Sequence, residues 1–302
     1  LKFKLENSID AGARKIEVSL RDGGRTYLSV NDDGAGMTKK ELSLSLERHA
    51  TSKLPNDNLE SIVTLGFRGE ALPSIASISR FQISSRARGS EEAWQLKVAG
   101  GDAFELVPVA HPQGTSVEVR DLFYATPARL KFLKTERTEL NHTVDVVKRL
   151  AMGNPSIAFT IHNGDRTILK LSCAQGDLLS VRLDRVDAIM GNEFGSNALA
   201  INAEREGLCL TGHAGLPTLN RGNATFQYLF VNGRSVRDKI LFGAVRGAYR
   251  DFLSHDRHPL LALFLEVPPD EIDVNVHPAK TEVRFRDSGL VRGLIVSALK
   301  HA

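Results

Sequence analysis

The chain has 302 residues, of which 42% are hydrophobic, and its formal net charge is +3 at pH 7. A chain of this length predicts two domains, and no apolar run approaches the roughly 20 residues of a membrane span, so we expect a globular protein without a membrane partner. So small a net charge also excludes a uniformly basic surface for nucleic acid, and any basic surface must be local. The two cysteines, Cys173 and Cys209, lie far apart, and we expect reduced thiols rather than a zinc site.

The first predicted element is a helix over residues 4–13 that ends at Gly12. Asn7 and Asp10 are spaced i, i+3 within it, so both side chains can point at one ligand. An asparagine carbonyl in this place can hold a hard cation such as Mg²⁺ beside phosphates. A solvated polar face is the alternative interpretation.

Residues 15–20 and 26–30 alternate polar and apolar side chains and predict a hairpin. The second strand runs into Asp32, Gly34, Gly36 and Met37. A carboxylate at a strand end followed by Gly-x-Gly offers an acceptor beside a floor without side chains. A planar base can lie on that floor with its exocyclic amine bonded to Asp32, although turns and Ca²⁺ loops share the pattern.

Two further stretches favour a phosphate ligand. After a short helix at 42–46 come Thr51, Ser52 and Lys53, whose hydroxyls and ammonium suit a lid over a triphosphate. A glycine-containing stretch then precedes an apolar run at 71–78 that predicts a helix, where glycines and free N–H groups suit an anion. This stretch consists of Gly66, Phe67, Arg68, Gly69, Glu70, Ala71 and Leu72. A basic surface loop and an ordinary glycine-rich turn are the respective alternatives.

The remaining elements follow from alternation and turn signals. A meander is predicted from strands at 81–85, 93–98, 104–109 and 115–119. A helix at 138–152 and an Asn-Gly hairpin at 157–171 follow, and 174–177 is the expected domain boundary. The second half is predicted to contain strands at 198–202, 208–214, 226–231, 234–236, 260–266 and 282–285, and helices at 238–253 and 289–299.

Five stretches together resemble the MutL family of DNA mismatch repair proteins. They are Glu6–Ala13 (ENSIDAGA), Asp32–Gly36 (DDGAG), Arg48–Lys53 (RHATSK), Gly66–Leu72 (GFRGEAL) and Asp273–Lys280 (DVNVHPAK). The asparagine of the first stretch, the Asp-x-Gly-x-Gly pattern of the second and the glycine lid are shared with the wider GHKL superfamily of ATPases, which includes gyrase B subunits and histidine kinases. The last two stretches are far more specific to MutL, and the resemblance covers nearly the whole chain.

The resemblance implies an α+β protein in two domains. Residues 1–175 would form the GHKL (Bergerat) ATP-binding α/β sandwich, and 178–302 a smaller domain similar to ribosomal protein S5. Asn7 would hold Mg²⁺ at the phosphates of ATP, and Asp32 would bond the adenine amine with Gly36 under the base and Thr115 nearby. The lid residues and the Gly66–Leu72 stretch would surround the phosphates. Lys280 would reach the γ-phosphate from the second domain.

One position departs from the family pattern. The family's general base is a glutamate four residues before the magnesium asparagine, where this chain has Phe3. Glu6 is a poor substitute because it lies roughly 100° around the helix from Asn7. Either the first residues are not native, which the start at Leu1 rather than Met favours, or the chain binds ATP and hydrolyses it poorly.

The family resemblance also implies partners. These are DNA, single-stranded or duplex, the mismatch-recognition protein MutS, a downstream nuclease and helicase, and a second copy that joins in an ATP-dependent dimer. Arg234 and Arg237 are expected near the DNA, in a cytoplasmic, nucleoid-associated protein. The rival hypotheses are a DNA-binding module in which nucleotide matters little, and another GHKL ATPase such as a gyrase-B-like enzyme.

Overall fold

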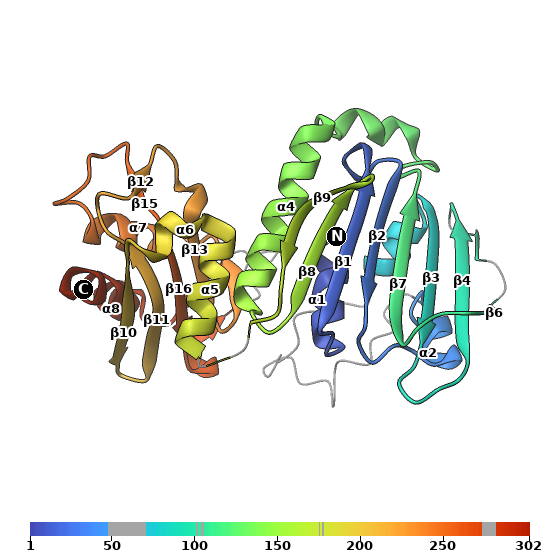
Figure 1. The fold of residues 1–302 in the computed structure, drawn as a ribbon, viewed down its shortest axis with the longest axis horizontal. Coiled ribbons are helices and arrows are strands. Elements are labelled where there is room, and N and C mark those ends of the chain that lie inside the picture. The colour runs from blue at the N-terminus through green and yellow to red at the C-terminus, as the bar shows by residue number, and fades with distance from the viewer. Residues whose placement is uncertain (48–70, 101, 104–105, 175, 177, 274–281) are drawn as a thin grey trace. The chain divides into compact units, whose positions relative to one another are not determined.

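The computed structural model describes the chain apart from residues 48–70, 101, 104–105, 175, 177 and 274–281 (Figure 1). The described residues divide into two compact units. Unit 1 contains Leu1–Ala151 and Ser156–Cys173, and unit 2 contains Met152–Pro155 and Ala174–Ala302. In neither unit is a described helix both long enough and apolar enough to cross a bilayer.

Unit 1 is built on a nine-stranded sheet in the order β5-β4-β3-β7-β2-β1-β8-β9, with β6 paired to β4. All pairs are antiparallel except β1 with β8. The strands are β1 (Lys15–Arg21), β2 (Tyr27–Asp32), β3 (Arg80–Arg86), β4 (Ala93–Ala99), β5 (Asp102–Ala103), β6 (Val107–Val109), β7 (Gly114–Arg120), β8 (Ala158–Asn163) and β9 (Arg166–Leu171).

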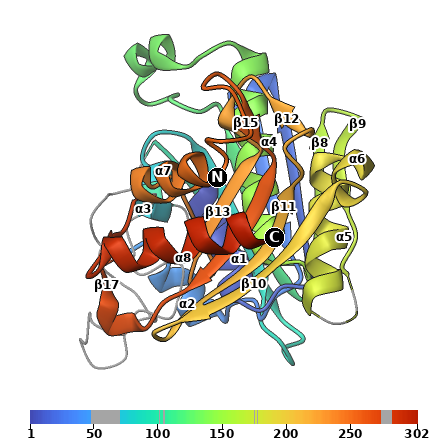
Figure 2. The same cartoon turned by 90° about the vertical axis from the view of Figure 1, so that its left-hand side faces the viewer.

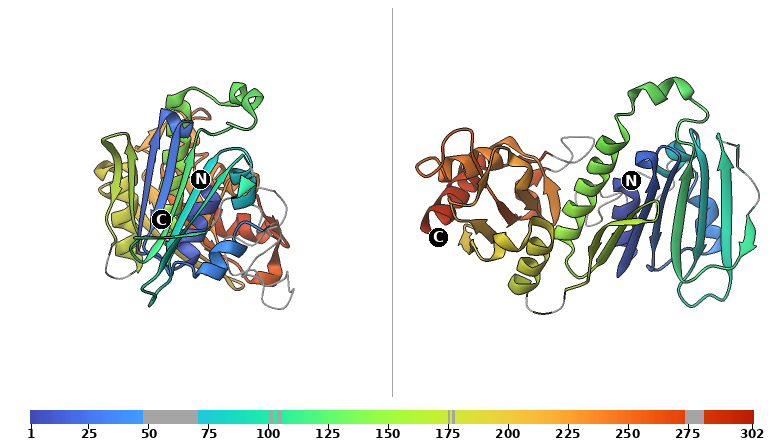
Figure 3. Two further views of the ribbon diagram at one scale, coloured as in Figure 1. Left: turned by 90° about the vertical axis from the view of Figure 1, so that its right-hand side faces the viewer. Right: turned by 45° about the horizontal axis from the view of Figure 1, so that its top comes forward.

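Alternation explains why these strands have one covered face. Ile16, Val18 and Leu20 of β1 are fully buried while the residues between them are polar, which is the period-2 pattern of a half-buried strand. Helices cover that face (Figure 3). They include α1 (Lys2–Asp10), α2 (Lys39–Leu44), α3 (Ala71–Ala76) and α4 (Glu136–Gly153), and short 3₁₀ turns lie at Asp22–Gly24 and Pro127–Phe132. One core cluster joins Leu42 of α2 and Ala76 of α3 to the strands β3, β4 and β7.

Unit 2 has a five-stranded sheet in the order β10-β11-β16-β13-β14, in which β13 and β16 are parallel (Figure 2). Its strands are β10 (Ala198–Arg205), β11 (Leu208–Gly215), β13 (Gln227–Val231), β14 (Arg234–Val236) and β16 (Leu261–Glu266). Two small pairs are β12 (Asn220–Arg221) with β15 (His258–Pro259), and β17 (Ile272–Asp273) with β18 (Arg284–Phe285). The helices are α5 (Leu178–Met190), α6 (Asn192–Gly195), α7 (Lys239–Ala248) and α8 (Ser288–His301), with 3₁₀ turns at Ala224–Phe226 and Pro269–Glu271.

Both faces of the unit 2 sheet are covered. Leu263 and Leu265 of β16 pack into the core that α7 and α8 close. Phe264, between them, must point to the opposite face, where its ring stacks on Phe230 and lies 4.2 Å from the guanidinium of Arg182 in α5. Unit 2 is therefore a three-layered α/β/α arrangement.

The predicted α+β class and most predicted elements are confirmed, but three predictions are wrong and one helix was not predicted. The strands after α3 do not form a meander, because β7 returns to lie between β3 and β2. The single strand expected at 104–109 is replaced, in the described residues, by β5 and β6. The helix predicted over 238–253 ends at Ala248, and the sequence reasoning missed α5 altogether.

Candidate functional site

Helix α1 brings four polar side chains to one end of the unit 1 sheet. Lys4 and Ser8 are buried, and they share a helix face because their spacing is i, i+4. Asn7 and Asp10 are half-buried on the neighbouring face of the same helix. The helix begins and ends slightly earlier than the predicted range of 4–13, since Ala11 is its C-cap and Gly12 follows just after it with a φ of +69°.

Asp32, the last residue of β2, is the centre of the site. Its Oδ2 atom accepts hydrogen bonds from the Lys4 ammonium at 2.9 Å and the Ser8 hydroxyl at 2.7 Å, and its Oδ1 atom accepts the Gly34 N–H at 3.1 Å. Burial alone would raise the pKa of Asp32. The ammonium of Lys4 and the three hydrogen bonds outweigh burial and hold the pKa below its ordinary value. Asp32 is therefore an anionic acceptor at neutral pH.

The glycine loop after Asp32 is fixed against two neighbouring segments. The Ala35 N–H donates to the Ala11 carbonyl at 2.9 Å, and the Arg88 N–H donates to the Ala35 carbonyl at 2.7 Å. Gly36 has a φ of +67°, and a Cβ there would clash with the backbone carbonyl of Arg86. The glycine is required because the loop runs directly against the end of β3. The Met37 N–H then donates to the Ser85 hydroxyl at 2.8 Å.

Strand β7 closes the other side of the site. Thr115 is the register partner of Asp32, is buried, and shares a 2.9 Å hydrogen bond with the Ser85 hydroxyl. Gly114, just before it, has a φ of +117°, and a Cβ there would clash with the Asp32 carbonyl. The structure thus brings together six of the predicted nucleotide contacts, namely Asn7, Asp10 and Asp32 with Gly34, Gly36 and Thr115, and Met37 continues the loop.

Among the described residues of this site, few side-chain oxygens are available to hold the Mg²⁺ of Mg-ATP. The described part of the chain contains no cluster of three or more His, Cys, Asp or Glu side chains suited to a metal. Mg²⁺ in nucleotide sites is commonly held by one or two protein oxygens together with phosphates and water, so a single amide oxygen such as that of Asn7 suffices. Oδ1 of Asp32 has one donor among the described residues and keeps capacity for a second.

Several predicted contacts lie outside the described residues. These are Thr51, Ser52, Lys53, Gly66, Phe67, Arg68, Gly69, Glu70 and Lys280. Ala71 and Leu72 are described and begin α3 as predicted. Phe3, four residues before Asn7, is 45% exposed, whereas Glu6 is buried and lies 3.7 Å from the ammonium of Lys2.

Sequence reasoning missed Lys4, Ser8, Ser85 and Gly114. The i, i+4 spacing of Lys4 and Ser8 was the one available signal, and it is weak because lysine is almost never fully buried unless paired. Ser85 reaches the site only through the pairing of β3 with β7, which joins residues about 30 positions apart.

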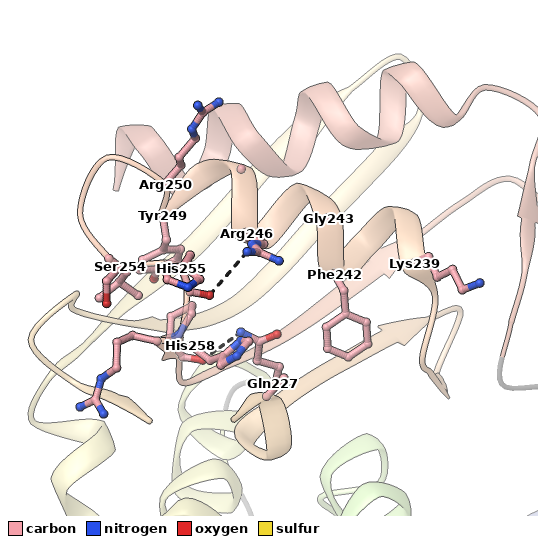
Figure 4. A pocket seen from close by; sticks show the side chains of 15 residues that line it. Gln227, Lys239, Phe242, Gly243, Arg246, Tyr249, Arg250, Ser254, His255 and His258 are labelled. Carbon is pink, nitrogen blue, oxygen red and sulfur yellow. Dashed lines mark hydrogen bonds between the residues drawn. The ribbon is translucent and has the colours of Figure 1, made fainter. Parts of the chain in front are cut away.

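A second feature lies wholly in unit 2, beside α7 (Figure 4). A cavity of about 730 Å³ is lined by fifteen residues, none of which is a carboxylate. Its polar and aromatic lining consists of Gln227, Lys239, Phe242, Arg246, Tyr249, Arg250, Ser254, His255, Arg257 and His258. Arg234 on β14 and Arg237, which follows that strand, precede α7. The cavity is suited to a polyanion.

Two family comparisons match separate parts of the chain. Residues 4–118 match the family described as histidine kinase-, DNA gyrase B- and HSP90-like ATPases. Residues 186–302 match the family described as the C-terminal domain of DNA mismatch repair proteins. The first match contains Asn7, Asp32 and Thr115, and the second contains the basic cavity.

Individual relatives match the whole chain. The DNA mismatch repair protein MutL of Rhodospirillum rubrum is 63% identical over 302 residues, and that of Paramagnetospirillum magneticum is 59% identical. The chain covers 48% and 50% of these proteins, so it spans about half the length of the curated relatives it matches. The Aquifex aeolicus MutL ATPase domain complexed with ADP is 28% identical with a TM-score of 0.69, over 97% of this chain and 94% of that one. The chain thus belongs to the MutL family of DNA mismatch repair proteins, and its first unit has the fold of the GHKL ATPases.

Proposed function

We propose that this chain is the ATP-operated part of a DNA mismatch repair protein. Unit 1 binds ATP with Mg²⁺ and hydrolyses it slowly, and the bound nucleotide controls dimerisation and DNA binding. The observation that supports this best is the buried, anionic Asp32 held between α1 and the glycine loop. A solved MutL ATPase domain described as complexed with ADP has the same fold over nearly the whole chain.

In this proposal each group has a physical role. Asp32 accepts the exocyclic amine of adenine beside Gly34 and Gly36, and the Asn7 carbonyl holds Mg²⁺ next to the phosphates. Lys280 would contact the γ-phosphate as a point charge, which makes the switch sensitive to ATP rather than ADP. Phe3 cannot accept a proton, so we expect the chain to bind Mg-ATP but to hydrolyse it slowly.

The nucleotide proposal is tested by equilibrium titration of ATP with Mg²⁺, alongside single-turnover hydrolysis. Asn7→Ala should weaken Mg-ATP binding strongly, and it should weaken ATP binding measured in EDTA much less. Equal affinity of the variant and the parent chain for Mg-ATP would refute the metal assignment. Binding without turnover would indicate that Phe3 stands where the base is needed.

DNA is the proposed partner of unit 2, and the carboxylate-free cavity beside α7 favours it. Arg234 and Arg237 are the residues that we expect to extend this surface. Affinity for a fluorescent oligonucleotide should fall steeply with salt, and Arg250→Glu should lower the salt slope by about one because a phosphate contact is lost. Arg205→Glu is the matched control, since Arg205 is exposed on β10 and does not line the cavity.

The same titration separates the main proposal from its rival. If the chain is an ATP-operated switch, a non-hydrolysable ATP analogue should raise DNA affinity and the apparent mass of the chain in solution. If it is a DNA-binding module in which nucleotide matters little, DNA affinity should be the same with and without the analogue. The proposal extends to further partners, namely MutS, a nuclease and a helicase, and to a location at the cytoplasmic nucleoid. These extensions rest on family membership.

A further inference from the structure

Helix α7 turns one face to the core of unit 2 and another to the cavity beside it. Leu241 and Val245 are buried on the core side. Lys239, Phe242 and Arg246 line the cavity, and their spacing of i, i+3 and i+7 places them on one face of the helix. At 1.5 Å per residue, Phe242 lies about 4.5 Å from Lys239 and about 6 Å from Arg246 along the helix axis. An aromatic ring therefore stands between two cations on the cavity wall.

The ring of Phe242 is available to a ligand. The residue is half-buried, and among the described residues its ring contacts neither a cation nor a second ring. The ring of Phe264 in the same unit is, by contrast, already stacked on Phe230. Figure 4 shows the Phe242 side chain directed from α7 toward Gln227, a buried residue of β13 that also lines the cavity. A Cβ at the neighbouring Gly243 would meet no atom within 4 Å, so the helix surface beside the ring is open.

The size and charge of the cavity fit an unpaired nucleotide better than a duplex. Its volume of about 730 Å³ falls within the range of roughly 300–1,000 Å³ that is usual for small-molecule pockets. Among the described residues Lys239, Arg246 and Arg250 form no ion pair, so their charges are free for phosphates. In a duplex the bases are stacked on one another, and extruding one of them costs free energy. A duplex can therefore reach the cations through its phosphates but leaves the Phe242 ring without a base.

We propose that Phe242 stacks on an unpaired base of single-stranded DNA, while Lys239 and Arg246 hold the phosphates on either side of that base. The inference rests on the proposed DNA partner of unit 2, and it assigns to Phe242 the preference for a single strand over a duplex. Gln227, which is 4% exposed, adds a polar group at the edge of the base. Its Nε2 atom donates to the Pro259 carbonyl at 3.3 Å, and its Oε1 atom has no partner among the described residues. Stacking tolerates every base, so we expect little sequence preference.

The test is equilibrium binding of one fluorescent oligonucleotide, as a single strand and as the matching duplex, to the parent chain and to Phe242→Leu. Both forms are titrated over the same range of salt concentrations, because contacts with phosphate depend on salt. Leucine keeps an apolar side chain against the core that Phe242 contacts, and Phe242→Trp restores an aromatic ring. Phe252→Leu is the matched control, since Phe252 is 64% exposed and does not line the cavity. The ratio of the two dissociation constants separates stacking from a general loss of folding.

We expect the parent chain to bind the single strand more tightly than the duplex. Phe242→Leu should weaken single-strand binding by about fivefold to a hundredfold, the range of one stacked base, and should leave duplex affinity and the salt dependence unchanged. Phe242→Trp should recover the single-strand affinity, and Phe252→Leu should behave as the parent chain does. A parent chain without preference for the single strand, equal losses for the two forms in Phe242→Leu, or no loss at all would overturn the role of Phe242 while DNA remained the partner of unit 2. If the parent chain bound neither form, the proposed DNA partner itself would be refuted.

Discussion

The ion pair between Lys4 and Asp32 should couple strongly in the folding of unit 1. Both side chains are almost entirely buried, and removing one partner of a buried pair costs about 3–5 kcal/mol because the other charge is left alone. Replacing both leaves no buried charge, so Lys4→Met and Asp32→Asn combined should cost less than the sum of the single changes. We expect a coupling free energy of about 2 kcal/mol or more.

The exposed pair between Lys15 and Glu17 provides a matched comparison within the same unit. Its N–O distance is 3.0 Å, nearly that of the buried pair, but its side chains are 60% and 36% exposed. Solvent screens such a pair, and its expected coupling is about 0–1 kcal/mol. The two double-mutant cycles, one on each pair, therefore compare ion pairs that have nearly the same N–O distance and differ in burial.

Urea unfolding followed by tryptophan fluorescence measures both cycles, because the chain has a single tryptophan, Trp94, on β4 of unit 1. The reasoning is refuted if the coupling of Lys4 with Asp32 does not exceed that of Lys15 with Glu17. A dependence on pH gives a second check. The pKa of Asp32 is lowered by folding, so its contribution is present above the ordinary value of 3.8 and is lost as the pH falls through the lower folded value. Asp32→Asn should remove that part of the acid dependence.

Two further predictions concern backbone fit and a buried phenol. Gly114→Ala should lower the free energy of unfolding of unit 1 by at least about 2 kcal/mol more than Gly89→Ala does, as measured by urea unfolding. Both glycines have positive φ, but only at Gly114 would a Cβ meet backbone, at the Asp32 carbonyl. Equal losses in the two variants would contradict this prediction. Burial raises the pKa of Tyr249, whose hydroxyl donates to the Gly215 carbonyl, to about 12. Its contribution to stability is therefore complete below the ordinary pKa of 10 and lost as the pH rises through about 12. Tyr249→Phe should remove an absorbance change near that pH, and an unchanged titration would count against the assignment.

The parts of the site that sequence predicted are those specified by local chemistry. Gly34 and Gly36 follow Asp32 directly, and a left-handed turn after a strand can be recognised from adjacent residues. The end of α1 was predicted for the same reason, because Gly12 marks a helix end wherever the helix packs. Local pattern does not report which side chains meet across the fold, so the partners of Asp32 had to come from the structure.

Non-local pairing accounts for most of the errors. Lys4 was not singled out in the sequence, because a lysine is buried only when it is paired, and its partner Asp32 lies 28 residues away. The insertion of β7 between β2 and β3 depends on strand register rather than on any single segment. Helix α5 was missed because its arginines, Arg182 and Arg185, look solvent-exposed in sequence, whereas Arg185 is buried and donates to the Pro155 carbonyl.

The parallel pairing of β1 with β8 also has a consequence for synthesis on the ribosome. Strand β2 follows β1 immediately and can pair at once, but β8 is made about 140 residues later, which at 5–20 residues per second leaves one edge of β1 open for on the order of ten seconds. An open edge is a template for other nascent chains. Lys15, Glu17 and Arg21 alternate with the apolar residues of β1, and their charges act as gatekeepers until the second partner emerges.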